Sequence, residues 1–558
     1  MRVTIVTRLN RWMITQAQLS SLTVPNSRRL LALGLFSVGA TVAPLHAQCI
    51  DSGAVWSSVT TVGSAADVRR RIAQDVGRCS TDGELIRSAL SLTPRFAVVS
   101  PVAWSVVMPA LNTTYNSALP SSLNDGPQWA GRGLTTTLSA GIRLETDRLS
   151  ISFTPDFVYQ QNRVFSILQS PMPDRSSFAS PWHSGIESVD LPIRFGTQPQ
   201  AVFFPGSSWF DVSAGPVSFG WSSDEQWWGP GIRNALILSN NAPGIPQIYL
   251  RSRHPLGTPL GDVEFRWLLG GLSESLFFDT LATDNLRALS AAVVTLRTAL
   301  DTGLTVGIAR SVYSPVRSVG SLPAHLFDVL TRWNQSADTI SDRPRHPSDQ
   351  LLSLFGRWVF PSNGLEIYGE WAKLLPPGFR EMLVEPQEHQ GYTVGLQWVN
   401  PLTTVTAFRL QAEATMLEQT PPSLRATIPS FYTSRFVPQG YTQRGQVIGA
   451  SIGPGSSSQF VAADYLTSRW RAGLELGRVR WDDDAYYRTP NGVSFVAHDV
   501  SIFAGLRGGA TVSGFDVDLE TILAKRLNYL FQSAVSGYAQ DRGFDVNNVT
   551  FRLRVTPR

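Results

Sequence analysis

The stretch Phe408-Arg409-Leu410-Gln411-Ala412-Glu413-Ala414-Thr415-Met416 alternates apolar residues with charged or polar ones. A period of two predicts an extended strand, because successive side chains of a strand point to opposite faces. One face of this strand is apolar and the other carries Arg409 and Glu413. The stretch therefore predicts a sheet whose two faces meet different environments.

The same alternation recurs along the chain from about residue 130 to the end. It is seen in Leu149–Phe153, Val263–Trp267, Leu365–Gly369, Tyr392–Trp398 and Val549–Val555. A region of about 430 residues, at roughly 10 residues per tilted strand and a similar or somewhat longer connection, allows on the order of 16 to 20 strands. The sequence predicts an all-β region of that size.

The period alone does not say which face is inside. In a soluble sandwich the apolar faces meet in a core, whereas in a membrane barrel they face lipid and the polar faces line the lumen. The charged fraction of 16% and the aromatic residues at strand ends, such as Trp267, Trp398 and Trp470, favour a large antiparallel transmembrane β-barrel. Its lumen is predicted to be lined by Glu366, Glu370, Arg409 and Glu413, and its partners to be outer-membrane lipid and the barrel assembly machinery.

The first 47 residues have the pattern of a secretory signal peptide. Arg28 and Arg29 precede an uncharged run from Leu30 to Val42, and Leu45-His46-Ala47 supplies a cleavage site with a small last residue. The run is too short for a spanning helix, so export through a cleaved signal and location in the outer membrane are expected. Residues 1–47 hold five of the 47 basic residues and none of the 43 acidic ones, so the mature chain has a net formal charge of −1. A nucleic-acid partner is not supported.

Two cysteines remain after processing, Cys49 and Cys79. In an exported protein this pair predicts a disulfide rather than a metal site, which would need further Cys or His ligands nearby. The triplet Asp482-Asp483-Asp484 could hold Ca²⁺, but a solvated acidic face is favoured. No metal and no cofactor are therefore predicted.

The region before the barrel is predicted to be helical. Ser64 with Asp67 and Thr81 with Glu84 have capping-box spacing, which predicts two short helices between Ser64 and Leu90. Pro101 and Pro109 interrupt the apolar stretch 96–111, which is interpreted as a connector. The expected organisation is a signal peptide (1–47), an N-terminal helical periplasmic segment (48–125) and an outer-membrane barrel (126–558).

The segment 227–243 combines two Trp, a Gly-Pro-Gly turn and an Asn-Asn pair. Paired indole rings beside amides suit a sugar, whose C–H faces stack on rings while its hydroxyls need donors and acceptors. The alternative is an interfacial aromatic anchor on a tight turn. The glycan-binding residues predicted here are Trp227, Trp228, Arg233, Asn234, Asn240 and Asn241.

Several blocks together resemble segments of the capsule assembly Wzi family of outer-membrane barrels. They are Trp227-Trp228-Gly229-Pro230-Gly231, Gln128-Trp129-Ala130-Gly131-Arg132-Gly133-Leu134, Glu366-Ile367-Tyr368-Gly369-Glu370-Trp371, His389-Gln390-Gly391-Tyr392-Thr393-Val394-Gly395 and Gly440-Tyr441-Thr442-Gln443-Arg444-Gly445-Gln446-Val447-Ile448-Gly449. The resemblance implies a barrel of about 18 strands with a small N-terminal helical part facing the periplasm. It also implies a surface lectin that holds capsular or other surface polysaccharide on the cell. The C-terminal Val555-Thr556-Pro557-Arg558 departs from the aromatic ending usual in such barrels.

A pore and an enzyme are the two other classes of function on which the sequence bears. A passive outer-membrane pore or transporter is the alternative that the alternation by itself supports. An enzyme is not expected, because the sequence has no His-Glu-x-x-His and no Gly-x-Ser-x-Gly motif. Glu366 and Glu370 on one strand would lie about 13 Å apart, too far for a glycosidase pair, and a pair of carboxylates from two strands is left open.

Overall fold

The computed structural model describes residues 58–95, 102–183, 187–281, 284–332, 347–374, 384, 388–403, 405–419, 429–488, 495, 497–533 and 544–558. All of them belong to the unit formed by residues 46–558. The predicted signal peptide (1–47) and Cys49 lie outside the described residues.

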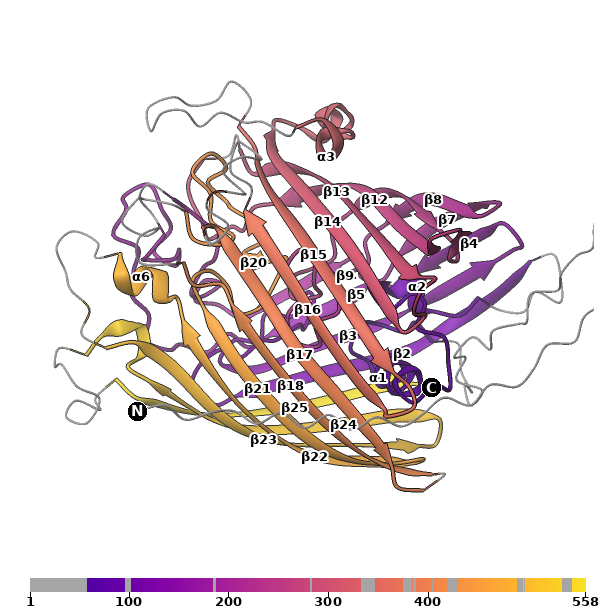
Figure 1. Ribbon diagram of the computed structural model, residues 1–558. Helices are drawn as coiled ribbons and strands as arrows, with labels where there is room; N and C mark the ends of the chain where they lie inside the picture. The colour runs from indigo at the N-terminus through magenta and orange to yellow at the C-terminus, as the bar shows by residue number, and fades with distance from the viewer. Residues whose placement is uncertain are drawn as a thin grey trace, which may run out of the picture. The chain divides into compact units, whose positions relative to one another are not determined.

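The described residues form a closed antiparallel barrel, which confirms the predicted fold class (Figure 1). β4 continues into β5, β6 into β7 and β10 into β11, so the sheet has 18 strands, and β2 pairs with β25 to close it. Its segments are β2 (Ala103–Asn116), β3 (Gly133–Glu145), β4 (Leu149–Phe153), β5 (Asp156–Gln160), β6 (Gln200–Phe204), β7 (Trp209–Ala214), β8 (Val217–Ser222), β10 (Gln247–Ser252), β11 (Leu256–Thr258), β12 (Gly261–Ser273), β13 (Leu286–Thr298), β14 (Leu304–Val316), β15 (Asp349–Phe360), β16 (Leu365–Leu374), β17 (Gln390–Pro401), β18 (Thr406–Met416), β21 (Ser457–Thr467), β22 (Trp470–Trp481), β23 (Asp499–Val512), β24 (Phe515–Leu527) and β25 (Val546–Pro557).

The two ends of the barrel differ in their connections. At one end the turns are short, as between β23 and β24, where Ser513 and Gly514 alone separate the strands. At the other end the connections are long, as between Gln160 of β5 and Gln200 of β6. In outer-membrane barrels the short turns are periplasmic and the long loops extracellular, which orients this barrel.

The outer face of the barrel is apolar and exposed. On β22, Leu474 and Leu476 are 59% and 56% exposed, whereas Glu475 between them is 1% exposed. The same alternation places Leu396 outside and Gln397 inside on β17. A band of exposed leucine, valine and isoleucine side chains around a closed sheet matches the hydrocarbon layer of a bilayer.

The N-terminal region is helical only in part. α1 (Ala65–Asp75) is present, and the Ser64 hydroxyl accepts from the Asp67 amide at 3.4 Å, as the capping spacing predicts. The second predicted helix is wrong. Its place is taken by β1 (Ile86–Ser88), which pairs with β9 (Gln226–Trp228), and by the short α2 (Ala89–Leu92). Long-range pairing with a distant segment overrides the local helical period there.

The predicted boundary at residues 125 and 126 is also wrong, because the barrel begins at Ala103 with β2. Pro109 is accommodated where the register against β3 shifts between Val107 and Ala110. A bulge leaves a residue outside the hydrogen-bond ladder, which is where a strand tolerates proline. The described part of the apolar stretch 96–111, from Ala103 onward, is thus a barrel strand and not a connector.

No helix among the described residues combines the length and the apolar character needed to cross a bilayer. Cys79 is disulfide-bonded.

Candidate functional site

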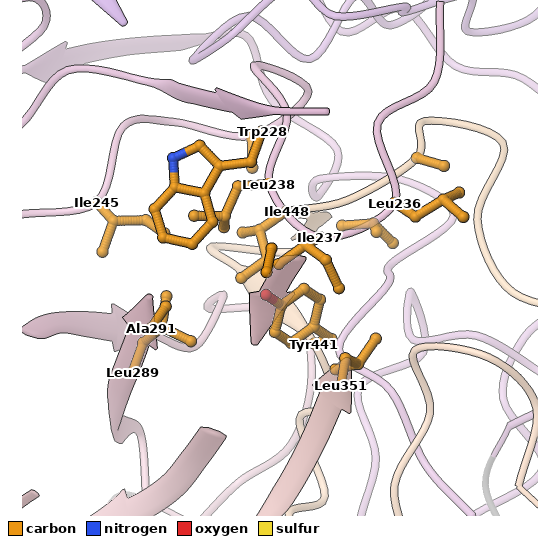
Figure 2. Packing of buried hydrophobic residues seen from close by; sticks show 14 of the residues in the cluster. Trp228, Leu236, Ile237, Leu238, Ile245, Leu289, Ala291, Leu351, Tyr441 and Ile448 are labelled. Carbon is orange, nitrogen blue, oxygen red and sulfur yellow. The ribbon is translucent and has the colours of Figure 1, made fainter. Parts of the chain in front are cut away.

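The segment 227–243, called the inner segment below, lies inside the barrel. Trp228, Leu236, Ile237 and Leu238 are each exposed by 1% or less. They belong to the main apolar cluster together with wall residues of β13 and β15, among them Leu289, Ala291 and Leu351 (Figure 2). The inner segment therefore fills part of the lumen.

The prediction that Trp227 and Trp228 stack on a sugar is wrong, because both side chains are buried. Trp227 is 2% exposed and packs with Val62, Leu92 and Ala235, with the Arg87 guanidinium 5.2 Å from its ring centre. Trp228 is 0% exposed. Neither ring offers a face to a sugar, because a stacking platform needs an accessible face. The sequence pattern of an aromatic turn was correct, but this turn points into the barrel.

Carboxylates of the barrel wall hold the inner segment in place. Glu413 accepts hydrogen bonds from the backbone amides of Ile232 at 2.6 Å and Asn234 at 2.9 Å, and from that of Arg233. The Tyr368 hydroxyl donates to the same carboxylate at 2.8 Å. Amides that would otherwise be unpaired in a buried loop are satisfied in this way.

Glu370 forms a second attachment. It accepts from the Leu236 amide at 3.1 Å and from the Ser353 hydroxyl at 2.7 Å. Gly229 has a φ of +114°, and a Cβ atom there would lie 2.8 Å from a Glu370 carboxylate oxygen. Only glycine fits this close approach.

The remaining two predicted lumen residues are buried in ion pairs. Glu366 binds the guanidinium groups of Arg71 on α1 and Arg357 on β15. Burial, together with the nearby Glu366, raises the pKa of Asp75 on α1 to about 9. Arg409 lies 2.8 Å from Asp464 on β21. α1 is thus fixed inside the short-turn end of the barrel by polar contacts.

A cavity of about 380 Å³ lies between the long loops and the wall formed by β21–β25. Its wall residues, such as Trp481, Asp499 and Arg526, stand at the long-loop ends of their strands. Its rings and polar side chains include Trp129, Phe165, Trp182, Phe460, Trp481, Phe503, Tyr529 and Phe531, with Arg233, Asn234, Asn241, Gln446, Arg526, Asn548 and Arg552. Aromatic surface mixed with amides and guanidinium groups can bind a ligand that has both C–H faces and hydroxyls.

Three of the residues predicted to bind glycan line this cavity. They are Arg233, Asn234 and Asn241. The Arg233 guanidinium stacks on Phe460, with its carbon 4.0 Å from the ring centre. Asn240 is apart from them and donates to the Val62 carbonyl at 3.3 Å. The structure brings together half of the predicted set.

The amides of the cavity are partly engaged by the protein. Asn234 donates to Thr415 at 3.1 Å, and Asn241 donates to the Val447 carbonyl at 2.9 Å. Arg526 binds Asp499 through two contacts of 2.7 Å and lies over the ring of Trp481. These contacts fix the side chains in place, so the cavity is largely preformed.

A buried histidine supports the rim of the cavity. The His183 imidazole nitrogens lie 3.1 Å from Glu187 and 2.8 Å from Asp482, which lines the cavity. Burial opposes the charge of His183, but Asp482 and Glu187 outweigh it and raise the pKa of His183 to about 10. The imidazolium thus links two loops beside the cavity.

Sequence reasoning missed Trp182, Trp481, Tyr529 and Phe531. They come from two connections and one strand end that are far apart in the chain, and no local motif joins them. Their isolated positions in loops rich in aromatic residues were the available signal.

The acidic triplet is not a solvated face, since Asp483 and Asp484 are 3% and 1% exposed. Burial raises the pKa of Asp484 to about 7, and its carboxylate accepts from the Gln419 amide at 2.8 Å. A different acidic group lies in the β12–β13 loop, where Glu274, Asp279 and Asp284 bring ligand atoms within 4.8 Å of one another.

Comparisons with known proteins bear on the fold. No protein-family model and no curated protein sequence matches the chain. Among solved structures, the chain is similar to Escherichia coli Wzi, an outer-membrane protein of group 1 capsule assembly described as a carbohydrate-binding β-barrel. The identity is 12%, the match covers 80% of this chain and 83% of that one, and the TM-score is 0.50.

Two solved structures of lower similarity are those of Acinetobacter baumannii OccAB4 and Pseudomonas aeruginosa OprD. The identities are 10% and 8%, and the matches cover 82% and 80% of this chain and 98% and 92% of those chains. The TM-scores are 0.36 and 0.34. The likeness to Wzi supports the class, a large β-barrel of the outer-membrane type.

Proposed function

We propose that this protein is an outer-membrane barrel that binds surface polysaccharide in the cavity at its long-loop end. The cavity carries the proposal. Its volume of about 380 Å³ falls in the range of ligand pockets, which is roughly 300–1,000 Å³. Its position at the extracellular end is where a polymer outside the cell would arrive.

The composition of the cavity supports a saccharide ligand. Trp182 packs edge-on against Phe531, with ring centres 5.5 Å apart, and is only partly buried. Fixed rings of this kind stack on the C–H faces of sugars, while the Arg233 guanidinium can donate hydrogen bonds to hydroxyls. Binding through preformed side chains loses little conformational entropy.

A more specific proposal is that the protein belongs to the Wzi family and takes part in attaching capsular polysaccharide and assembling the capsule. The sequence blocks around Trp129, Glu366, His389 and Tyr441 and the likeness of the barrel to E. coli Wzi support it. Export through cleavage of residues 1–47 and delivery by the barrel assembly machinery belong to the same proposal.

A passive pore is less well supported. The inner segment and α1 occupy the lumen through the apolar cluster around Leu236 and the ion pairs of Glu366. A water-filled channel needs a continuous polar path, which these contacts obstruct. Planar bilayers containing the purified protein are expected to show no steady conductance, and steady porin-like currents would favour the pore.

The binding experiment compares two Trp→Ala variants of the purified protein reconstituted in liposomes. The ligand is surface polysaccharide isolated from the producing bacterium. Trp182→Ala removes a ring of the cavity and is expected to weaken binding about fivefold to tenfold, equivalent to about 1–1.4 kcal/mol. Trp104→Ala, on the outer face where the side chain is 74% exposed, is the matched control and should bind as the wild type does.

The proposal fails if wild-type protein does not bind the polysaccharide, or if Trp182→Ala and Trp104→Ala bind it equally well. A strain that lacks the protein is expected to release polysaccharide into the medium. A strain producing Trp182→Ala at wild-type levels should release it in part.

A further inference from the structure

Two short helices lie on the outside of the barrel. They are η1 (Val319–His325) and α3 (Asp328–Thr331), and residues 319–331 are called the outer strap below. The outer strap contacts β12, β13 and β14, and α3 stands beside the upper ends of β13 and β14 in Figure 1. Its Leu322 and Leu326 pack on a small apolar cluster made by Leu269, Ala288 and Val316.

The register of β13 and β14 shows which face the outer strap covers. Val294 and Ile308 are paired and are 42% and 44% exposed, so they belong to the outer, apolar face. The next outward pair toward the long loops is Ala292 with Arg310, on the same face. Arg310 is nevertheless only 5% exposed, because the outer strap lies over it.

Several backbone polar groups of the outer strap are turned toward the barrel. The Arg310 guanidinium donates to the carbonyls of Val329 and Arg332. The Ser290 hydroxyl donates to the Leu326 carbonyl at 3.0 Å and accepts from the Val329 amide at 3.2 Å. A guanidinium on the membrane side of a barrel is costly unless its donors are satisfied, and the strap supplies acceptors.

The opposite side of the outer strap is apolar and exposed. Val319, Phe327 and Leu330 are 69%, 54% and 55% exposed. The Phe327 ring centre lies 5.0 Å from that of Trp267, which is paired with Ala292. Phe327 therefore lies beside the outward position next to that of Val294 in the apolar band, about 7 Å away along the strand.

We propose that the outer strap is a lipid-binding element, whose apolar side lies among the acyl chains and headgroups of the outer leaflet. Two observations carry this assignment: the apolar side continues the exposed band of β13 and β14, and the strap turns the Leu326 and Val329 backbone groups inward onto Ser290 and Arg310. The assignment rests on the proposed location in the outer membrane.

A second copy of the chain is a weaker occupant for this surface. Stable protein interfaces bury about 800 Å² on each partner, and three apolar side chains on a short segment supply much less. Lipid needs no such area, because every exposed apolar side chain gains separately from contact with acyl chains.

Site-directed spin labelling tests the proposal in liposomes that contain phosphatidylethanolamine and phosphatidylglycerol. A nitroxide is attached to Leu330→Cys, and its accessibility to oxygen, which concentrates in lipid, is compared with that to a water-soluble nickel chelate. Leu474→Cys on the apolar band is the lipid reference, and Leu276→Cys in the β12–β13 loop, where the leucine is 90% exposed, is the water reference. Wild-type protein treated with the same reagent supplies the blank, and Phe327→Cys repeats the test at a second position.

The expected result is a high oxygen-to-nickel ratio at Leu330→Cys, close to that of Leu474→Cys and well above that of Leu276→Cys. A ratio close to that of Leu276→Cys would overturn the proposal for the strap while leaving the barrel in the membrane. Spectral broadening that disappears on dilution with unlabelled protein would mean that a second copy covers the strap, which also overturns it. A water-like ratio at Leu474→Cys would remove the membrane location itself, and the lipid-binding strap with it.

Discussion

The two sides of the lumen are filled in different ways although both are built from strands of the same alternation. Along β13 and β15 the inner segment packs on Leu289 and Leu351, and its apolar side chains are almost fully buried. Along β21–β25 the wall carries ion pairs, such as Arg507 with Asp464 at 2.6 Å, below a cavity of about 380 Å³. The apolar side fixes the structure, and the polar side leaves room for a ligand.

The difference shows why an 18-stranded barrel need not be a pore. A wide barrel encloses water unless chain segments fill it. Here the filling segment is anchored by the buried carboxylates of Glu370 on β16 and Glu413 on β18. The predictions below test the anchored, apolar side against the polar side, and the free energies are those of unfolding by urea in liposomes.

Trp228→Ala is expected to have the largest effect, a loss of about 4 kcal/mol, because it opens a large cavity in the apolar side. Trp104→Ala, whose side chain is 74% exposed outside, is the control and should change the free energy of unfolding little. Equal losses in the two variants would mean that the inner segment does not stabilise the barrel.

Glu413→Ala should cost about 3 kcal/mol, because the amides of Ile232, Arg233 and Asn234 lose a charged acceptor in a buried place. It should also produce intermittent currents in planar bilayers as the inner segment loosens. Glu413→Gln retains one acceptor oxygen and is expected to lose about half as much. If Glu413→Ala passes no current and unfolds with the free energy of the wild type, apolar packing alone holds the segment.

The His183 pair predicts a pH dependence on the polar side. The folded-state pKa of about 10 lies above the unfolded value of about 6.5, so the stabilisation is complete below pH 6.5 and is lost as the pH rises through 10. Between pH 7 and 9 the wild type should lose about 2 kcal/mol more than His183→Gln. If the free energy of unfolding changes with pH in the same way for both proteins, His183 does not carry a stabilising charge.

Neighbouring residues of β24 give the smallest contrast. Arg526 points into the cavity and binds Asp499, and Arg526→Ala should cost about 1.5 kcal/mol. Lys525 is on the opposite face, and its pair with Asp545 spans 3.3 Å with the lysine side chain 41% exposed. Lys525→Ala should change the free energy by less than about 0.5 kcal/mol, because solvent screens that pair. Reversed magnitudes would mean that the cavity wall is not held by its ion pairs.

Half of the predicted glycan-binding residues line the cavity. Arg233, Asn234 and Asn241 were named from one short block and do line the cavity. Trp227 and Trp228 in the same block are buried, since a turn that presents rings looks the same in sequence whether it faces solvent or a lumen. Trp182 and Trp481 could not be joined to the site, because loop closure over long separations brings them together.

The sequence by itself determined which side chains of a strand share a face, because a period of two assigns alternate residues to opposite faces, and the low charged fraction with aromatic strand ends favoured a barrel over a sandwich. For example, the alternation around Leu410 and Glu413 predicts the outer and the inner face of β18 without knowledge of the neighbouring strands. Only the tertiary structure decided what lies within and upon that barrel. The inner segment, the cavity and the outer strap depend on contacts between residues far apart in the chain, and such contacts leave no periodic trace in the sequence.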